Sequence, residues 1–389
     1  MGQHRPQRNE QNEVDDWMKV LDRLPFVGSM KRDMTSLRRL LYDRRAPRVA
    51  AIGFAGGGRT SLANGVLNAV AFGAAGAAPP PDAGSWVRIN ADGRRLDWLE
   101  LPADVERDAL VELARGAFDE TPPDLLVGVV EAGAELRQAE PVREALLALR
   151  KTLKEAYDTT PKVLVVLSKV DTLPPTGDAP PYSDAKRSGI ELALSALRES
   201  MGSLGVAEEA YVPVCARPYD GEPYDPRYNL DGLGEALLNN LPDDARLEAV
   251  RAFEVGRDAR REVARTLVNS CSAIAVTVGL APIPFADAFV LLPLQGAMVT
   301  GIAYLSGRGW DKKAAAEWLG SVGAIGSAGF GLRWGAQQLV KLVPGAGSLV
   351  GAGVAGAGTL AIGRSAMAYF IDGPGSDNQR PELRADNPA

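Results

Sequence analysis

Histidine is almost absent from this sequence. Of 389 residues only His4 is a histidine, and it lies in a polar amino-terminal segment. This excludes imidazole as a general base in the folded body, and with it Ser-His-Asp triads and His-rich metal sites. Cysteine is nearly as scarce, since Cys215 and Cys271 are the only two and cannot form a disulfide framework or a zinc site. Any chemistry must therefore use other side chains, backbone groups or a bound ion.

A basic excess is also lacking. The chain has 43 Lys and Arg against 49 Asp and Glu, a net charge of −6. A nucleic-acid partner would require a basic surface, so we expect none. Residues 1–16 are polar and charged, which argues against a secretory signal. Together with the few cysteines, this predicts a cytoplasmic protein, with the cytoplasmic membrane as the one surface to consider.

Composition divides the chain into five predicted parts. Residues 1–13 are expected to be a disordered tail, and residues 14–45 two amphipathic helices. The second helix is rich in Lys and Arg. It either packs on the next domain with a solvated basic face or binds a partner or a membrane surface. The remaining parts are an alternating region at 46–243, a charged connector with an apolar helical domain at 244–372, and a disordered tail at 373–389.

Within residues 46–243, short apolar runs alternate with amphipathic stretches. This order predicts an α/β domain with a mostly parallel sheet and helices on both faces. The expected strands are 49–53, 86–89, 96–101, 124–130, 163–167 and 210–214, and the expected helices are about 59–70, 104–117, 138–157, 185–202 and 231–241.

A glycine-rich turn follows the first strand and opens a helix, which is the context that a phosphate-binding loop requires. Backbone N–H groups of such a turn cradle phosphate oxygens, and the start of the helix adds its positive end. Arg59 stands where the Walker pattern has Lys, and the Thr60 hydroxyl stands where Mg²⁺ is bound. The alternative is a glycine-rich turn without a ligand. The predicted phosphate-binding residues are Gly53, Gly56, Gly57, Gly58, Arg59, Thr60 and Ser61.

A buried strand at 163–167 leads into Ser168-Lys169-Val170-Asp171. This resembles the guanine-specificity motif of the Ras-like and Era-like P-loop GTPases. A carboxylate at Asp171 can accept hydrogen bonds from the N1 and N2 donors of guanine, a pair that adenine lacks. The Lys169 stem can lie over the base, and Ser168 can tie this loop to the phosphate loop. The alternative is an ordinary helix start with a solvated charge pair.

A second resemblance follows the strand at 210–214. Cys215-Ala216 is similar to the Ser-Ala motif of the same superfamily, whose Ala amide meets the guanine O6. The resemblance covers residues 46–243 in the correct motif order. It implies that GTP or GDP binds together with Mg²⁺, with Thr60 and Glu100 as the metal-binding residues.

The hydrolytic parts of the superfamily pattern are degenerate. The segment that should read Asp-x-x-Gly is Glu100-Leu101-Pro102-Ala103, with Asp97 as an alternative carboxylate, and residues 71–84 contain no Ser or Thr. Loss of the glycine removes its hinge freedom. These departures predict weak, slow or absent hydrolysis, and we assign no catalytic residue.

Residues 266–372 resemble a bacterial domain of unknown function that commonly follows GTPase domains and is often membrane-linked. The matching residues include Pro282-Ile283-Pro284, Ala286-Asp287, Leu294-Gln295, Met298, Ile302, Pro344-Gly345-Ala346-Gly347, Thr359, Gly363 and Tyr369-Phe370.

The apolar domain has a stretch, residues 342–363, that carries no charge and is near the length of a bilayer span. Gly347, Gly351 and Ala355 recur every fourth residue, as do Gly353 and Ala357, which favours close helix packing. The alternative to a membrane helix is a soluble hairpin packed on itself or on a second copy. Asp287 is expected to cap a helix; the alternative is a functional acid within the membrane.

These patterns together predict a guanine-nucleotide-binding, switch-like protein with weak or slow GTP hydrolysis, in which nucleotide state is coupled to a membrane-associated or self-associating helical domain. Two alternatives stay open. One is a pseudo-GTPase scaffold that needs no nucleotide. The other is a membrane-remodelling module that the G domain only regulates.

Overall fold

The computed structural model describes residues 37, 39, 44–69, 71–72, 82–91, 94–219, 224–253, 255–280, 291–310, 318 and 347–373. The chain divides into two compact units, which are described separately below. Residues 45–256 form one unit, and residues 1–44 with 257–389 form the other. The predicted disordered tails, most of the predicted helices at 14–45 and the predicted cap Asp287 lie outside the described residues.

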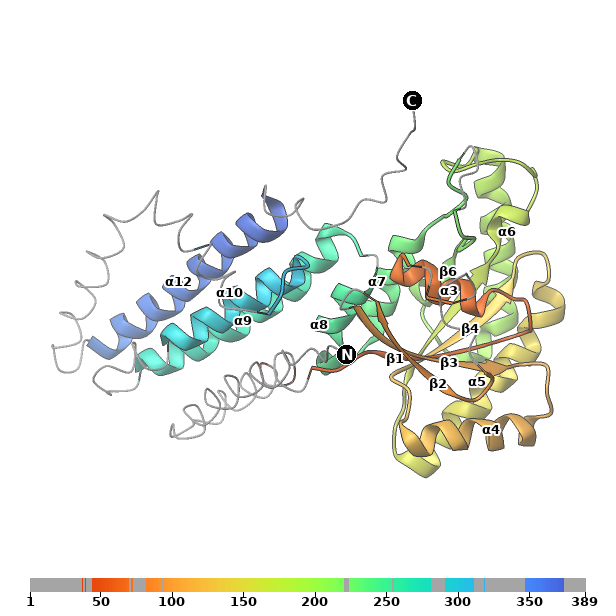
Figure 1. The fold of residues 1–389 in the computed structure, drawn as a ribbon, viewed down its shortest axis with the longest axis horizontal. Coiled ribbons are helices and arrows are strands. Elements are labelled where there is room, and N and C mark those ends of the chain that lie inside the picture. Colours follow the sequence, from red (N-terminus) through yellow and green to blue (C-terminus); the bar gives the residue numbers. More distant parts are fainter. Residues whose placement is uncertain are drawn as a thin grey trace, which may run out of the picture. The chain divides into compact units, whose positions relative to one another are not determined.

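The first unit is an α/β domain built on one six-stranded sheet (Figure 1). The strand order is β2-β3-β1-β4-β5-β6. All neighbouring pairs are parallel except β2 with β3, which is antiparallel. The strands are β1 (Arg48–Gly53), β2 (Trp86–Ala91), β3 (Arg94–Pro102), β4 (Leu125–Glu131), β5 (Lys162–Ser168) and β6 (Tyr211–Pro213).

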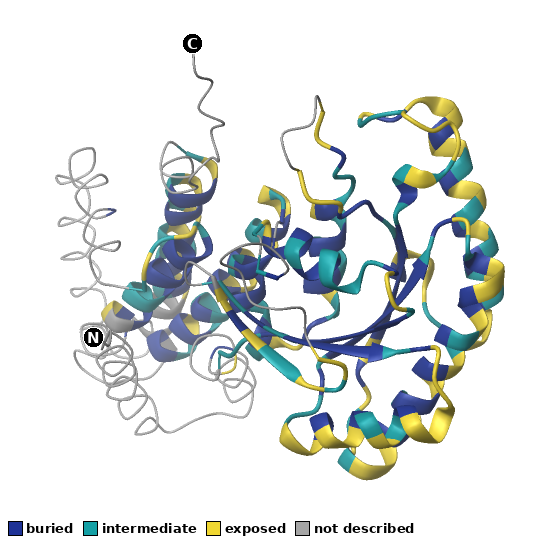
Figure 2. Ribbon diagram, turned by 45° about the vertical axis from the view of Figure 1, so that its right-hand side comes forward, coloured by how far each residue is buried: buried dark blue, intermediate teal, exposed yellow. Residues whose placement is uncertain are grey.

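Helices cover both faces of this sheet, as the alternation of strands and helices predicts. One face carries α4 (Arg107–Glu120), α5 (Glu135–Tyr157) and α6 (Asp184–Met201), and the other carries α3 (Arg59–Leu67), α7 (Leu230–Asn240) and α8 (Asp243–Ala252). The central strands are buried along their length, whereas α4, α5 and α6 expose their outer faces (Figure 2). Burial on both faces explains why β4 and β5 are continuous apolar runs.

The boundary of this domain differs from the prediction. The charged connector that was predicted to begin the 244–372 part contains two helices: α8 ends at Ala252 and α9 begins at Arg257. Helix α8 belongs to the α/β unit because Glu248 is fully buried and its carboxylate pairs with Arg95 of β3 at 2.8 Å. The division therefore falls at 256/257 rather than at 243/244. The sequence of α8 is highly charged and so resembles an exposed connector, but one of its charged residues, Glu248, is buried and paired with Arg95.

The second unit is helical. Its described helices are α9 (Arg257–Leu280), α10 (Leu292–Leu305) and α12 (Gly347–Met367), followed by a π-helical turn, η5 (Ala368–Asp372). The three helices pack against one another, and α9 and α12 lie side by side (Figure 1). A hydrogen bond of 3.0 Å from Gln295 Nε2 to the buried Thr359 Oγ1 joins α10 to α12.

Two glycines, Gly356 and Gly363, bring α12 close to α9, whereas Gly353, one of the residues indicated by the four-residue spacing, does not contact it. A Cβ added at Gly363 would stand 2.6 Å from both Cγ atoms of Val268, and one at Gly356 would collide with Val276. A Cβ at Gly353 would meet nothing within 4 Å. The contacting glycines are thus seven residues apart, about two turns, which keeps both on the face toward α9.

One helical stretch, Gly353–Asp372, is long and apolar enough to cross a membrane by length and composition alone. It is 39% buried within the protein. A core helix of a soluble protein meets the same criterion, so this stretch is weak evidence for a membrane span.

Candidate functional site

The candidate site lies at the carboxyl-terminal edge of the sheet, where β1 enters the glycine-rich loop. Gly53 ends β1 so close to β4 that an added Cβ would stand 2.7 Å from the Val129 carbonyl oxygen. The loop then turns with Gly57 N donating to Phe54 O at 3.1 Å. Gly58 has φ of 99°, in the left-handed region that glycine adopts freely, and α3 begins at the next residue. Strand, turn and helix therefore follow the geometry predicted for a phosphate loop.

The start of α3 is not capped by any side chain among the described residues. Its first turn has no acidic residue either. The first amide groups of a helix have no intrahelical partner and attract anions. An uncapped, acid-free helix start after a glycine turn is the arrangement in which a phosphate can accept these hydrogen bonds.

The phosphate loop and the predicted base loop are in direct contact. Ser168 Oγ donates to Gly57 O at 2.7 Å and also lies 3.3 Å from Val130 O. Ser168 is 3% exposed, so this hydrogen bond is shielded from water. The sequence predicted this link, and its presence confirms that the two loops lie on the same side of the domain.

The base loop is held in a defined shape. Lys169 has φ of 55°, and its ammonium pairs with Glu131 at 3.0 Å. Asp171 follows in a short 3-10 turn. Lys186, which is fully buried, donates from Nζ to the carbonyl oxygens of Asp171 at 2.6 Å and of Leu173. Its third partner is the Pro175 carbonyl oxygen at 3.3 Å.

Cys215 reaches the same loop from the end of β6. Its backbone forms a two-way bridge with Tyr228, and its thiol is 1% exposed. The pKa of Cys215 is raised to about 12, mainly by burial and in smaller part by the negative charge of Asp171. The thiol is therefore protonated at neutral pH. Ala216 packs under α3, where a Cβ added at Gly65 would stand 3.1 Å from the Ala216 Cβ.

The end of β3 shows where the predicted metal residues lie. Thr60 Oγ1 donates to Glu100 Oε1 at 2.9 Å, and Trp98 Nε1 donates to the same oxygen at 3.2 Å. Arg59 Nε lies 3.5 Å from Glu100 Oε2, and Arg59 NH1 donates to Leu101 O at 2.5 Å. Glu100 is 5% exposed. Both carboxylate oxygens therefore already have partners within the protein.

This arrangement does not fit the Mg²⁺ site that the resemblance implies. Magnesium needs about six oxygen ligands near 2.1 Å, with one or two carboxylates among them. Thr60 and Glu100 do come together, but they bond to each other, and a guanidinium faces the second carboxylate oxygen. No cluster of three metal-binding side chains occurs among the described residues.

Asp97, the alternative carboxylate, lies at the wrong end of the sheet. In the register of β1 with β3, Asp97 is opposite Arg48, whereas Glu100 is opposite Ala51 and Pro102 is opposite Gly53. Asp97 is thus at the amino-terminal edge, five residues from the phosphate loop along β1. Asp97 as the alternative metal-binding carboxylate was therefore wrong, because it lies at the edge of the sheet away from the phosphate loop.

Sequence reasoning missed two residues of the site, Trp98 and Lys186. Leu96, Trp98 and Glu100 alternate along β3, so their side chains point to the same buried face of the sheet. A carboxylate in this pattern was the signal that Glu100 has a hydrogen-bond partner inside the protein. Lys186 occupies a face of α6 with Ile190 and Leu194 at four-residue spacing. A lysine on such an apolar stripe was the signal for a buried ammonium with a fixed partner.

Comparisons with known proteins find only distant similarity. No protein-family model and no curated protein matches the chain. Among solved structures, Era in complex with MgGDPNP and 16S ribosomal RNA matches with 16% identity and a TM-score of 0.31, over 60% of this chain and 68% of that one. Toc33 from Arabidopsis thaliana matches with 20% identity and a TM-score of 0.32, over 59% and 95%.

A variant of SsGBP also matches, with 17% identity and a TM-score of 0.27, over 49% of this chain. The chain spans 59% of the length of that protein. Similarity this low carries no argument about function. The α/β P-loop G-domain-like fold is shown by the strand order, the glycine turn between β1 and α3, and the contact of this turn with the end of β5.

Proposed function

We propose that this protein binds a guanine nucleotide across the carboxyl-terminal edge of the sheet. The phosphates would lie on the turn at Gly53–Ser61, and the base against the loop at Ser168–Asp171 with Cys215 and Ala216. The observation that carries the proposal is the buried hydrogen bond from Ser168 to Gly57, because it fixes the two half-sites relative to each other. Asp171, whose turn is held by the hydrogen bond from Lys186 to its carbonyl oxygen, supplies the acceptor that distinguishes guanine from adenine.

A substitution at Asp171 tests the base assignment. Asp171→Asn replaces two acceptor oxygens by one acceptor and one donor, so the affinity for GDP should fall. The affinity for xanthosine diphosphate, which has an oxygen in place of the N2 amine, should rise. The matched control is Asp184→Asn, the same chemical change at a highly exposed carboxylate. The assignment is contradicted if Asp171→Asn and Asp184→Asn change the affinities for GDP and for xanthosine diphosphate to the same extent.

We further propose that hydrolysis is slow or absent. Ala103 N, the amide expected to sense the γ-phosphate, donates to Gly53 O at 3.1 Å and so continues the β1–β3 pairing. Arg59 is held by Glu100 and Leu101 at the same edge. Single-turnover measurement with GTP tests this, and turnover at a rate typical of an efficient enzyme, about 1 s⁻¹ or more, contradicts it.

Coupling of nucleotide state to the helical unit is the finer part of the proposal. It is supported by one apolar helix of spanning length in that unit and by its covalent link to the G-domain-like unit at 256/257. Carbonate extraction of expressed protein with GDP or GTP present tests it. Complete release into the soluble fraction in both states argues for the scaffold alternative and against a membrane role.

A further inference from the structure

The first inference concerns the cation at the nucleotide site, and it rests on the proposed function. We propose that the Arg59 guanidinium takes the place of Mg²⁺, so that guanine nucleotide binds this protein without a divalent metal. The starting point is position: Arg59 is the first residue of α3, directly after the phosphate turn, and its side chain is 13% exposed. A positive charge is therefore already held at the end of the predicted phosphate cradle.

The contacts of Arg59 leave it able to act toward phosphate. A guanidinium has five N–H donors in a fixed planar fork. In this structure Nε faces Glu100 and NH1 donates to Leu101 O. The remaining donors can serve phosphate oxygens, which guanidinium groups bind in pairs. Glu100 is neutralised at the same time, so the nucleotide does not meet an uncompensated buried carboxylate.

The neighbours of Glu100 complete the argument. Thr60 Oγ1 and Trp98 Nε1 both donate to Glu100 Oε1, so the oxygen that a metal would take is occupied by two neutral donors. To bind there, Mg²⁺ would have to displace these two hydrogen bonds and the ion pair with Arg59. An indole cannot be a metal ligand, and its presence beside the carboxylate indicates a site built for hydrogen bonding.

Fluorescent GDP titrated with Mg²⁺ and with EDTA tests this inference on the full chain. The wild-type dissociation constant should change less than about threefold between the two conditions, since the protein supplies the cation. In Arg59→Lys, GDP binding should become dependent on Mg²⁺, because an ammonium lacks the planar set of donors with which the guanidinium can contact both Glu100 and phosphate. Tenfold or greater tightening of wild-type binding by Mg²⁺ overturns the inference while leaving the proposed function intact.

A second variant guards against a folding defect in Arg59→Lys. Glu100→Gln removes the negative charge but keeps an acceptor for Thr60 and Trp98. If Glu100 only neutralises Arg59, this variant should bind GDP in EDTA as well as wild type or better. If it loses GDP binding in EDTA, the inference fails. Absence of GDP binding in wild type under both conditions refutes the proposed function itself, which is a distinct outcome.

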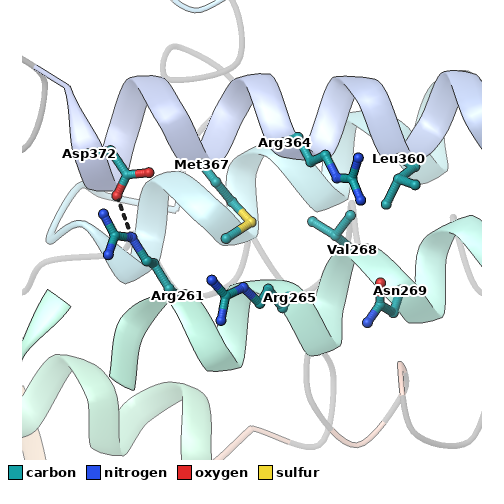
Figure 3. A pocket seen from close by; sticks show the side chains of 8 residues that line it. All are labelled: Arg261, Arg265, Val268, Asn269, Leu360, Arg364, Met367 and Asp372. Atoms are coloured by element: carbon teal, nitrogen blue, oxygen red, sulfur yellow. Dashed lines mark hydrogen bonds and ion pairs between the residues drawn. The ribbon is translucent and has the colours of Figure 1, made fainter. Parts of the chain in front are cut away.

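A second inference comes from the helical unit and is independent of the nucleotide site. Helices α9 and α12 enclose a cavity of about 490 Å³, with η5 at one end (Figure 3). Three arginines line it: Arg261 and Arg265 from α9, and Arg364 from α12. Arg261 is paired with Asp372 at 2.7 Å and with Asp258. Among the described residues, no ion pair engages Arg265 or Arg364.

The rest of the lining has a polar part, Asn269 and the Asp372 carboxylate that Arg261 pairs with, and an apolar part. Val268 of α9 and Leu360 and Met367 of α12 form this apolar part, as Figure 3 shows. Val268 is the residue against which Gly363 packs, so this wall is part of the α9–α12 contact and is held in place. Two guanidinium groups on facing helices beside an apolar wall match a ligand with a phosphate group and a hydrocarbon part.

We infer that this cavity binds the phosphate group of an anionic phospholipid. Vesicle sedimentation with phosphatidylcholine alone and with added phosphatidylglycerol tests it, using the double variant Arg265→Gln/Arg364→Gln. Loss of two contacting charges should weaken binding to anionic vesicles by roughly tenfold or more. The control is Lys151→Gln/Lys154→Gln, which removes the same net charge from exposed positions on α5.

Each outcome is decisive. Selective loss in the arginine variant supports a phosphate site in the cavity. Equal loss of vesicle binding in the arginine and lysine double variants shows attraction by net charge alone and overturns the inference of a phosphate site. Titration with inorganic phosphate distinguishes the source: saturable phosphate binding that depends on Arg265 and Arg364, without vesicle binding, overturns the lipid assignment. Circular dichroism of the variants verifies that the helices are retained.

Discussion

The Ser168 hydroxyl donates to the Gly57 carbonyl oxygen at 2.7 Å, across 111 positions of sequence. This bond joins the end of β5 to the turn between β1 and α3. Because Ser168 is buried, the bond is not exchanged for one with water. The relative placement of these two segments, the proposed phosphate and base half-sites, depends on it.

Ser168→Ala should weaken GDP binding by roughly tenfold and lower the free energy of unfolding by about 1–2 kcal/mol, because the buried Gly57 carbonyl loses its donor. Nucleotide titration and urea unfolding measure the two effects. The control is Ser195→Ala, where the hydroxyl bonds within its own exposed helix to Glu191 O. An unchanged GDP affinity in Ser168→Ala would show that the tie does not position the site.

Lys186→Met should destabilise the domain by about 2–4 kcal/mol, because a fully buried ammonium and its hydrogen bonds to the carbonyls at 171, 173 and 175 are lost. It should also abolish GDP selectivity over ADP, since the Asp171 loop loses its support. Urea unfolding and competition titration measure these effects. Lys151→Met, at a side chain that is 61% exposed, is the control and should do neither.

The two cysteines should resist alkylation in the native state. Burial raises the pKa of Cys215 to about 12 and raises that of Cys271 as well. Unfolded thiols ionise near pH 8.5, so native thiols keep their protons where unfolded ones lose them. The stability linked to these thiols is full below about pH 8.5 and declines as pH rises toward 12. Iodoacetamide labelling at pH 8 in native and denaturing buffer tests this, and rapid native labelling contradicts it.

Gly363→Ala should lower the melting temperature of the helical unit. Its Cβ would stand 2.6 Å from both methyl groups of Val268, a buried β-branched side chain with little freedom to move. The same change at Gly358, where a Cβ meets nothing within 4 Å, should stabilise α12 by about 0.5–1 kcal/mol through helix propensity. Thermal scans of the two variants compare them directly, and equal shifts would contradict this packing of α9 and α12.

Local patterns predicted most of the fold. Apolar runs bounded by turns located every strand of the sheet, because β1, β4 and β5 are buried on both faces and leave a clear signal. Glycines and hydroxyls in motif order located both halves of the site, since their chemistry depends on short spacing. These predictions concern residues close together in the sequence.

The features that the sequence did not reveal depend on strand register and on contacts between residues far apart in the sequence. Pairing of Arg59 with Glu100 requires β1 and β3 to be neighbours in one particular register, which no local pattern encodes. The inclusion of α8 in the α/β unit depends on the buried pair of Arg95 and Glu248, separated by 153 positions. The glycines that contact α9 are set by the rotation of α12, and spacing alone allows several faces.

The central claim is that one nucleotide bridges Gly57 and Asp171, and competition titration of the full-length protein tests it most directly. Fluorescent GDP is bound first and displaced with GDP, GTP and ADP in turn. The account predicts displacement by GDP and GTP and about a hundredfold or weaker displacement by ADP, since a site built for the guanine donors leaves its acceptor unpaired with adenine. No binding of fluorescent GDP, or displacement by ADP at the same concentration as GDP, would contradict it.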